Sequence, residues 1–462
     1  MNDFDSLTRD ELVAVILELR SALETLKEGM SALDEENERL RAENEELRTR
    51  LGGPKGGGKQ TPVWVKANRP ERRKRGRKNR GKWFGRLRET PTEVVEHALE
   101  RCPDCGRKLS GGTVHHSRQV IEIPETPVSV IEHRVIARYC GVCGKTHMPR
   151  LDLSGEVIGK SRMGVRLMSL VSYLHIECRM PKERTQGYLA AAYKLHLGLG
   201  EISEILHRVA RCGKAEYEEL LEAVRGSPAV NADETGWRED GKNGYVWSFS
   251  TPEVRYFVRD ASRSHKIPER VLGEEYGGVV VSDFYSAYGL LLGRHQRCWV
   301  HMIRDLDELA EANRDKRGVG IWAGKVKAVY RRAKAFSSED AKERQKQRLA
   351  FEGELMRLAR PYVKRDVPQR VLAERIVSFL PEMLMFVECA DVPSDNNAAE
   401  RAIRPVVTAR KVSGGTRSSK GSDTRMTLTS LFATWRLRGE DSMECCRRML
   451  TATSSFPSPA PA

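Results

Sequence analysis

The sequence has 462 residues, 39% of them hydrophobic, which is enough for two or three domains with buried cores. Its formal net charge is +15, and residues 55–88 hold 14 lysines and arginines against one acidic residue. No apolar run reaches the ~18 residues that span a bilayer, and the acidic first residues are unlike a signal peptide, so we expect a cytoplasmic protein with no membrane partner. The ten cysteines include two CxxC pairs, a usage typical of metal binding in a reducing compartment rather than of a disulfide framework.

Residues 1–51 are predicted to form a dimerising coiled-coil helix. Leucine occupies every d position of the heptads, from Leu12 at each seventh residue to Leu47. The a positions include Asn37 and Asn44, and buried asparagines at a fix the register of a parallel dimer. The alternative is a lone amphipathic helix packed on its own domain. Nearly six heptads without a third apolar face favour a homodimer or a higher oligomer.

Residues 52–93 are predicted to be a flexible basic arm, because Gly52-Gly-Pro54 ends the helix and no regular period follows. Aromatic residues, among them Trp83 and Phe84, interleave with the charge and favour contact with a nucleic-acid backbone over a plain solvated linker. The arm residues expected to bind DNA are Arg72, Arg73, Lys74, Arg75, Arg77 and Lys78.

Residues 94–152 are predicted to be a small β-rich zinc-binding domain. Its two CxxC pairs, Cys102-Pro-Asp-Cys105 and Cys140-Gly-Val-Cys143, are each followed by a glycine, which lets the backbone amides turn toward the sulfurs. Four thiolates make a closed, structural Zn²⁺ site. β-like runs at 117–124 and 128–133 predict strands around it. Three nearby histidines are expected to face solvent or DNA rather than the metal: His115, His116 and His147.

Residues 160–227 have a helical pattern. Two helices are expected at 182–193 and 201–212, joined by a turn at 194–200. This arrangement is either a DNA-binding helix-turn-helix or a plain helical hairpin in the core, and the sequence favours neither.

Residues 228–440 are predicted to be an α/β catalytic domain of RNase H-like order, with three strands in quick succession, a helix and a fourth strand. The strands are expected at 229–233, 244–250, 254–258 and 277–283, with the helix at 264–273. A charged helical insertion should occupy about 304–388, and a final helical region should begin near Asn396. Residues 441–462 should hold the end of the C-terminal helix and a disordered tail. The whole chain is thus expected to be multidomain.

Carboxylates at the predicted strand ends are the candidate catalytic residues. Asp233 and Asp283 each follow a β run, and carboxylates of neighbouring strands can share Mg²⁺ or Mn²⁺. A third, Glu400, lies in the first turns of a predicted helix beside Arg401 and Arg404, which place cations where a phosphate backbone could bind. Taken singly, each of these carboxylates would be read as a cap or a solvated residue.

The stretches that carry these residues resemble transposases of the insertion sequence 66 family. They are Ala232-Asp-Glu-Thr235, Asp283-Phe-Tyr-Ser-Ala-Tyr288, Cys298-Trp-Val-His301 and Asn396-Asn-Ala-Ala-Glu-Arg-Ala-Ile-Arg-Pro405. The order of coiled coil, basic arm and double CxxC region is also similar to that family, so the resemblance covers all but the tail. One departure is Phe284, where a glycine would be more typical.

The resemblance implies an Asp-Asp-Glu transposase in which Asp233, Asp283 and Glu400 form the catalytic triad. It further implies two-metal cleavage and strand transfer on double-stranded DNA, both transposon ends and target, at the bacterial nucleoid, with small accessory proteins of the same element as partners. For Cys298 and His301 a core-packed helix start is favoured over a metal site. Two rival interpretations stay open: a non-catalytic DNA-binding regulator, and a nuclease that cuts strands without joining them.

Overall fold

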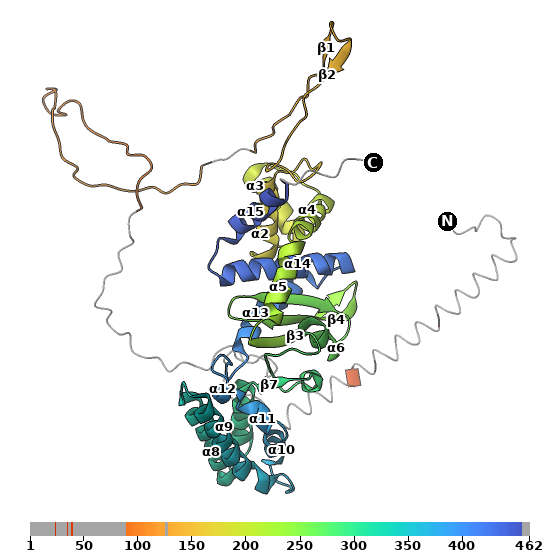
Figure 1. Cartoon of the computed structure of the whole chain (residues 1–462). Helices are drawn as coiled ribbons and strands as arrows, with labels where there is room; N and C mark the ends of the chain where they lie inside the picture. The colour runs from red at the N-terminus through yellow and green to blue at the C-terminus, as the bar shows by residue number, and fades with distance from the viewer. Residues whose placement is uncertain (1–23, 25–34, 36–37, 40–88, 125–127, 455–462) are drawn as a thin grey trace. The chain divides into compact units, whose positions relative to one another are not determined.

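The computed structural model describes residues 24, 35, 38–39, 89–124 and 128–454 (Figure 1). The four isolated N-terminal positions are helical. The a and d positions of the predicted coiled coil, the basic residues of the arm and the tail at 455–462 lie outside the described residues. The predictions made for these three segments therefore stay predictions.

The chain divides into two compact units, Met1–Ile121 and Glu122–Ala462. In the first unit, residues 89–121 have irregular backbone apart from one bridge between Arg101 and Lys108. In the second unit, β1 (Arg138–Cys140) pairs with β2 (Lys145–His147) in a regular hairpin around the second CxxC pair.

The strands predicted at 117–124 and 128–133 are wrong, because the described residues of both stretches have irregular backbone. Their alternating apolar side chains face solvent, and Val120 and Ile123 are 80% and 87% exposed. A strand needs a partner for its backbone hydrogen bonds and a surface for its apolar face, and the described residues around these stretches offer neither.

A five-stranded mixed sheet forms the centre of the second unit. Its strands are β3 (Ala229–Glu239), β4 (Lys242–Ser250), β5 (Arg255–Asp260), β6 (Val279–Ser282) and β7 (Arg294–Arg297). They stand in the order β5-β4-β3-β6-β7, with the first three antiparallel and β3, β6 and β7 parallel. The predicted succession of three strands, a helix, here α6 (Lys266–Leu272), and a fourth strand is present.

Alternation along the strands gives the sheet two different faces, each covered by helices. On one face Val230, Trp247 and Phe249 join the core of α2 (Val165–Ile176), α4 (Leu199–Cys212) and α5 (Lys214–Arg225). On the other, Trp237, Val246 and Phe257 pack against α13 (Asn397–Ser413). This division decides which helix each strand side chain can meet.

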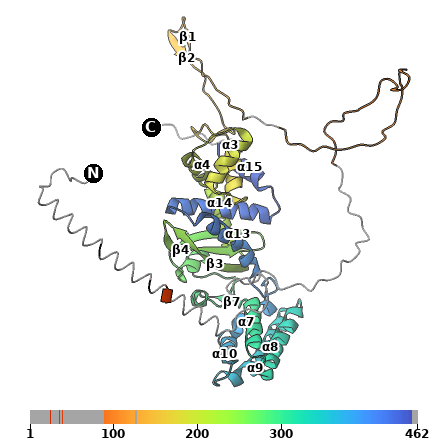
Figure 2. The ribbon, with the colours of Figure 1, turned by 180° about the vertical axis from the view of Figure 1, so that it is seen from behind.

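Helix α14 (Ser419–Leu437) lies along the edge strand β5 (Figure 2). The backbone N–H groups of Arg255 and Phe257 donate to the side chains of Thr434 and Ser430 at 3.0 and 2.9 Å. These bonds satisfy edge amides that would otherwise be open to another strand. Helix α15 (Ser442–Ser454) follows and packs on α2, so residues 442–454 form a complete helix rather than the end of one.

The predicted helix pair is present as α3 (Lys182–Tyr193) and α4. Helix α4 packs against α2 and α14 and buries Ile202, Ile205 and Val209, as the inner face of either a helical hairpin or a helix-turn-helix would. The exposed Glu204 on α4 forms ion pairs with arginines of the same helix.

The predicted helical insertion forms a bundle with a core of its own. Its helices are α7 (Trp299–Ala312), α8 (Arg317–Ala335), α9 (Ala341–Ala359), α10 (Arg370–Ser378), α11 (Leu380–Met383) and α12 (Met385–Glu388). Trp299, Tyr330, Phe351 and Leu355 belong to that core. The bundle lies at the β7 side of the sheet, where α11 and α12 contact β7 (Figures 1 and 2). In the described part of the chain, no helix is both long and apolar enough to cross a membrane.

Candidate active site

Asp233 and Asp283 come level with each other where the parallel strands β3 and β6 stop pairing. The ladder joins Ala229 to Val279 and ends with Asn231 paired to Val281. Two further residues along each chain bring Asp233 beside Asp283. Since side chains two apart in a strand share a face, both carboxylates belong to the face of Asn231 and Val281, the face on which α13 lies.

The prediction that Asp233 ends its strand is wrong. β3 continues to Glu239, and Asp233 pairs with Ser248 of β4. Asp233 therefore stands at a branch point, where the parallel partner on one side has ended while the antiparallel partner on the other continues. The sequence reading missed this because Thr235 and Gly236 look like a turn, yet the antiparallel ladder carries them to the hairpin at Asp240.

Glu400 reaches the same edge because Asn396 attaches the start of α13 to β3. The Asn396 side chain, 1% exposed, donates to the backbone oxygen of Ala232 at 2.7 Å and accepts from the Asn231 side chain at 2.9 Å. Glu400 follows about one helical turn later, and its backbone N–H donates to the Asn396 oxygen. The sequence allows either Asp395 or Asn396 to cap this helix; the Asn396 side chain binds the strand, while Asp395 accepts from the N–H of Asn397 at 3.2 Å.

The electrostatics of Asp233 tie the three carboxylates together. Burial, together with the negative charges of Glu234, Asp283 and Glu400, raises the pKa of Asp233 to about 7, against a backbone hydrogen bond that lowers it. Charges shift a neighbour's pKa strongly only at short range. The site is therefore one region of concentrated negative charge that would be relieved by a cation.

One oxygen of this cluster lacks any partner in the described structure. Oε1 of Glu400 is buried without a hydrogen bond, and the nearest group that could carry a positive charge is Nε2 of His301, at 3.9 Å. A buried carboxylate oxygen without a donor is the kind of atom that a hard divalent cation satisfies. The donor set of three carboxylates thus fits Mg²⁺ or Mn²⁺ by chemistry.

The carboxylates do not form a closed metal cage. Among the described residues, no group of three or more His, Cys, Asp or Glu side chains is arranged to hold a metal ion. Binding would require the Asp233, Asp283 and Glu400 side chains to turn toward one another.

Glu234, the neighbour of Asp233, has different partners because its side chain faces the opposite side of the sheet. Its side chain is 3% exposed and accepts from the Tyr288 hydroxyl at 2.6 Å and from the Arg263 guanidinium at 2.6 and 3.1 Å. Arg263 in turn stacks over the Tyr285 ring at 3.8 Å. The Glu234 carboxylate thus has side-chain partners, whereas the hydrogen bond given for Asp233 comes from the backbone N–H of Glu234 at 2.9 Å. The sequence reading quoted Glu234 only as part of a motif.

The C-x-x-H stretch is the core-packed helix start that was expected, and it borders the site. Cys298 is buried at the start of α7, and its sulfur accepts from the Asn396 N–H at 3.1 Å. Trp299 stacks on Tyr330 with ring centroids 4.6 Å apart. His301, one turn along, is the residue that approaches Glu400. Phe284 packs against the insertion, with its ring 5.4 Å from that of Phe379, so the departure from glycine adds a contact beside Asp283.

Each CxxC pair has the local geometry of a metal-binding knuckle. Gly106 and Gly144 take positive φ angles of 72° and 63°, and their amides donate to Cys102 and Cys140 oxygens at 2.9 Å. Backbone amides within each knuckle lower the pKa of the Cys102 and Cys140 thiols, which favours the thiolate that metals bind. His147, expected to face away from the metal, places Nε2 3.2 Å from the Cys143 sulfur.

The candidate DNA-binding residues are only partly described. Arg401 and Arg404 are exposed on α13 beside Glu400. The six basic residues of the arm lie outside the described residues.

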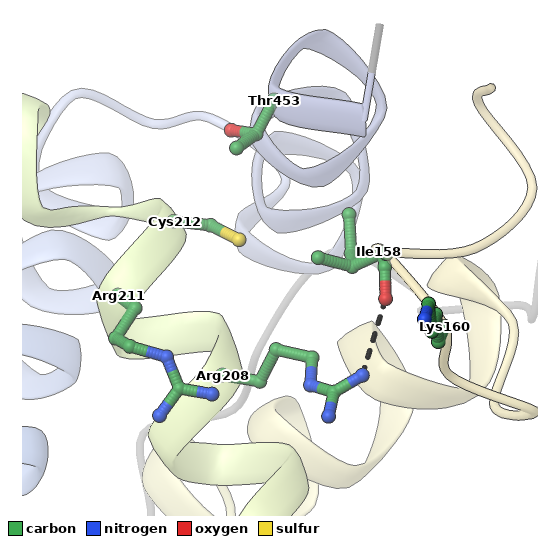
Figure 3. A pocket seen from close by; sticks show the side chains of 7 residues that line it. Ile158, Lys160, Arg208, Arg211, Cys212 and Thr453 are labelled. Carbon is green, nitrogen blue, oxygen red and sulfur yellow. Dashed lines mark hydrogen bonds between the residues drawn. The ribbon is translucent and has the colours of Figure 1, made fainter. Parts of the chain in front are cut away.

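A pocket of about 370 Å³ lies between α4 and α15 (Figure 3). Two of the cations that line it are already engaged: Arg208 donates to the Ile158 oxygen at 3.1 Å, and both Arg208 and Arg211 pair with Glu204. None of the residues that line it belongs to the acidic cluster.

The fold and the site define an α/β protein with an acidic cluster at the edge of a mixed sheet, built from strand and helix residues far apart in sequence. A family model described as "Transposase IS66 family" matches residues 160–424. The chain belongs to this family, and the matched span includes Asp233, Asp283 and Glu400.

Two curated proteins of Sinorhizobium fredii (strain NBRC 101917 / NGR234) are similar to the chain. "Uncharacterized protein y4jD" is 25% identical over 290 residues, which cover 55% of this chain and 56% of that protein. "Uncharacterized protein y4jO" is 33% identical over 162 residues, which cover 35% of this chain and 49% of that protein. The chain thus spans about half the length of the curated relatives it matches.

Proposed function

We propose that the chain is a DNA transposase that binds the ends of its element and cleaves and joins DNA strands at a divalent-metal site. The observation that carries the proposal is the meeting of Asp233, Asp283 and Glu400 at one sheet edge, where the charges of Asp283 and Glu400 act on Asp233. The topology supports an RNase H-like interpretation of the domain. Membership in the family supports DNA as the substrate.

Asp233, Asp283 and Glu400 are the residues that would hold Mg²⁺ or Mn²⁺. Such ions, when bound, supply charge neutralisation at the scissile phosphate and acidify the attacking water or 3′-hydroxyl. Asn396 holds the helix of Glu400 against the strand of Asp233. Arg401 and Arg404, both exposed and one turn or less from Glu400, are placed to bind the phosphates on either side of the reacting one.

The test is metal-dependent cleavage of a duplex that carries the inverted repeat flanking the coding sequence. Asp233→Asn, Asp283→Asn and Glu400→Gln are nearly isosteric, so each should keep folding and DNA binding while abolishing cleavage, because a neutral amide is a poor ligand for a hard cation. Asp391→Asn, which removes an exposed carboxylate a few residues before α13, is the matched control and should cleave normally.

The outcomes separate the proposal from its two rivals. A wild-type chain that binds the duplex but never cleaves it with Mg²⁺ or Mn²⁺ would be a regulator. Cleavage without joining to a target duplex would indicate a nuclease. If any of the three variants cleaves DNA normally, the residue substituted in that variant does not belong to the triad.

We also propose the assembly that the N-terminal sequence predicts. The heptads of residues 12–51 would join two copies, the basic arm would contact DNA without regard to sequence, and the four CxxC cysteines would bind one Zn²⁺. Pairing of two copies suits an enzyme that must hold two transposon ends.

A further inference from the structure

Helix α13 has one apolar face and one basic face. Its apolar residues, Ala402, Ile403, Val406 and Ala409, are buried against the sheet. Arg401, Arg404 and Lys411 recur on the opposite side at spacings of three and seven residues, and all three are exposed. The basic face starts beside Glu400 and runs away from it along the helix.

The turn after α13 adds two exposed cations and is hydrogen-bonded to the end of β3. Thr416 pairs with the end of β3 through its N–H to the Arg238 oxygen and its oxygen to the Asp240 N–H, both at 2.9 Å. Gly415 makes this approach feasible, because a Cβ there would lie 2.1 Å from the Arg238 oxygen and the φ angle is +112°. Arg417 and Lys420, on either side of the start of α14, are exposed as a result.

The cations of this surface have no protein partner in the described part of the chain. None of the five side chains of the basic strip forms an ion pair or hydrogen bond there: Arg401, Arg404, Lys411, Arg417 and Lys420. Arg410, on the buried side, differs, since its guanidinium binds the Gly236 oxygen and the Thr235 hydroxyl. Between residues 397 and 421 there are six basic residues and one acidic residue, Glu400. A surface with this density of unpaired cations attracts polyanions.

We propose that the basic strip binds the DNA duplex that flanks the scissile phosphate. This proposal rests on the proposed function and extends it to a particular surface. From Arg401 to Lys411 the helix rises about 15 Å, which corresponds to four or five base pairs. Residues 397–421 contain no aromatic side chain on which unpaired bases could stack. The strip therefore binds the phosphates of a duplex and contributes affinity without reading sequence.

The test compares two triple variants of the full chain that lose equal charge. Lys411→Gln/Arg417→Gln/Lys420→Gln removes the far part of the strip, whereas Lys325→Gln/Lys342→Gln/Lys346→Gln removes exposed lysines of α8 and α9. The DNA is a duplex of about 40 base pairs, which is about twice a typical binding site. Binding to this duplex is measured in EDTA at several salt concentrations. We expect the slope of log affinity against log salt to fall by up to about 3 in the strip variant, at about 0.9 per lost contact, and to stay unchanged in the control.

A second measurement ties the strip to the active site. Cleavage of substrates with progressively shorter flanks should become slower in the wild type once the flank is shorter than about five base pairs, and the strip variant should already be slow on long flanks. If the strip variant has the same salt slope and the same dependence on flank length as the wild type, the strip does not bind the flanking duplex. A chain that shows the expected slope change yet never cleaves would overturn the proposed function and leave the DNA surface standing.

Discussion

Asp233 and Glu234 are neighbours in sequence, yet the pleat of β3 sends them to opposite faces of the sheet. Asp233 joins Asp283 and Glu400 on the α13 face, and burial with these charges raises its pKa to about 7. Glu234 meets Arg263 and Tyr288 on the other face. Because successive side chains of a strand point to opposite faces, Asp233 is available for chemistry while Glu234 positions neighbouring residues.

Loss of the Tyr288 hydroxyl should weaken the link between the two aspartate segments. Tyr288→Phe removes a hydrogen bond to the buried carboxylate of Glu234, so we expect it to lower the free energy of unfolding by about 1.5–3 kcal/mol. Tyr285→Phe is the matched control, since its hydroxyl donates to the exposed backbone oxygen of Arg263 and its loss should cost less than about 1 kcal/mol. Urea unfolding of both variants measures this, and equal losses would argue against a special role for Tyr288.

His175 should make the helical layer sensitive to acid. Burial, together with the charge of Arg425, lowers its pKa to about 3. The neutral ring hydrogen-bonds the Met180 oxygen at 2.8 Å and accepts from Arg425 at 3.0 Å. Because the unfolded chain protonates this histidine near its ordinary pKa of 6.5 while the folded chain resists, its contribution is complete above pH 6.5 and is lost as pH falls from 6.5 toward 3.

The matched variant is His175→Gln, whose amide can donate to the Met180 oxygen and accept from Arg425 without titrating. Thermal unfolding between pH 5 and pH 7.5, a window chosen from this pKa, should show a flatter pH dependence for the variant than for the wild type. Parallel curves for the two proteins would show that His175 is not the acid-sensitive group.

At the scale of elements, local pattern predicted most of the sheet and the helices that flank it. The helix at 182–193 and the strands around 244–250 and 254–258 have clear periods, and the structure places α3, β4 and β5 there. β7 could not be predicted, because its residues Arg-His-Gln-Arg look like a polar loop. His295, Gln296 and Arg297 are buried, and hydrogen bonds such as that from Gln296 to the Met383 oxygen at 3.1 Å offset part of the cost of burying them.

The junction of β3 and α13 rests on Asn396, which no local pattern reveals. Asn396→Ala removes two buried side-chain hydrogen bonds and leaves the Asn231 amide only the longer bond to the Asp395 oxygen at 3.3 Å, so we expect the free energy of unfolding to fall by about 2–4 kcal/mol. Cleavage should fall further than stability explains, because Glu400 loses its fixed distance from Asp233. Asn397→Ala, whose side chain makes no hydrogen bond in the described structure, is the control. If both variants cleave equally at a temperature where both are folded, Asn396 does not position Glu400.

At the scale of the whole molecule, the acidic site depends on contacts between distant segments. Asp283 lies 50 residues after Asp233, and Glu400 lies 117 residues after Asp283. The insertion between them folds around its own core and returns the chain to the sheet through Ser394, whose oxygen accepts from the Trp299 N–H at 3.0 Å. Through the family resemblance, the sequence predicted that these three carboxylates should lie together. The contacts that bring them together could be seen only in the folded structure.

Zinc should be the factor that folds the CxxC region. Within the described residues, those at 94–151 leave large apolar side chains uncovered, such as Val142 at 99% exposure, and they have too little regular structure to bury them. Small modules without a core commonly obtain their folding free energy from a metal. Both knuckles already favour thiolates, so we expect one zinc per chain, bound by Cys102, Cys105, Cys140 and Cys143.

Elemental analysis of the full chain should find one equivalent of zinc in the wild type and a clear loss of zinc in Cys102→Ser. Chelation should expose residues 94–151 to proteolysis while the sheet unit stays intact. Purified chain without zinc, or Cys102→Ser retaining a full equivalent, would rule out the four-cysteine site.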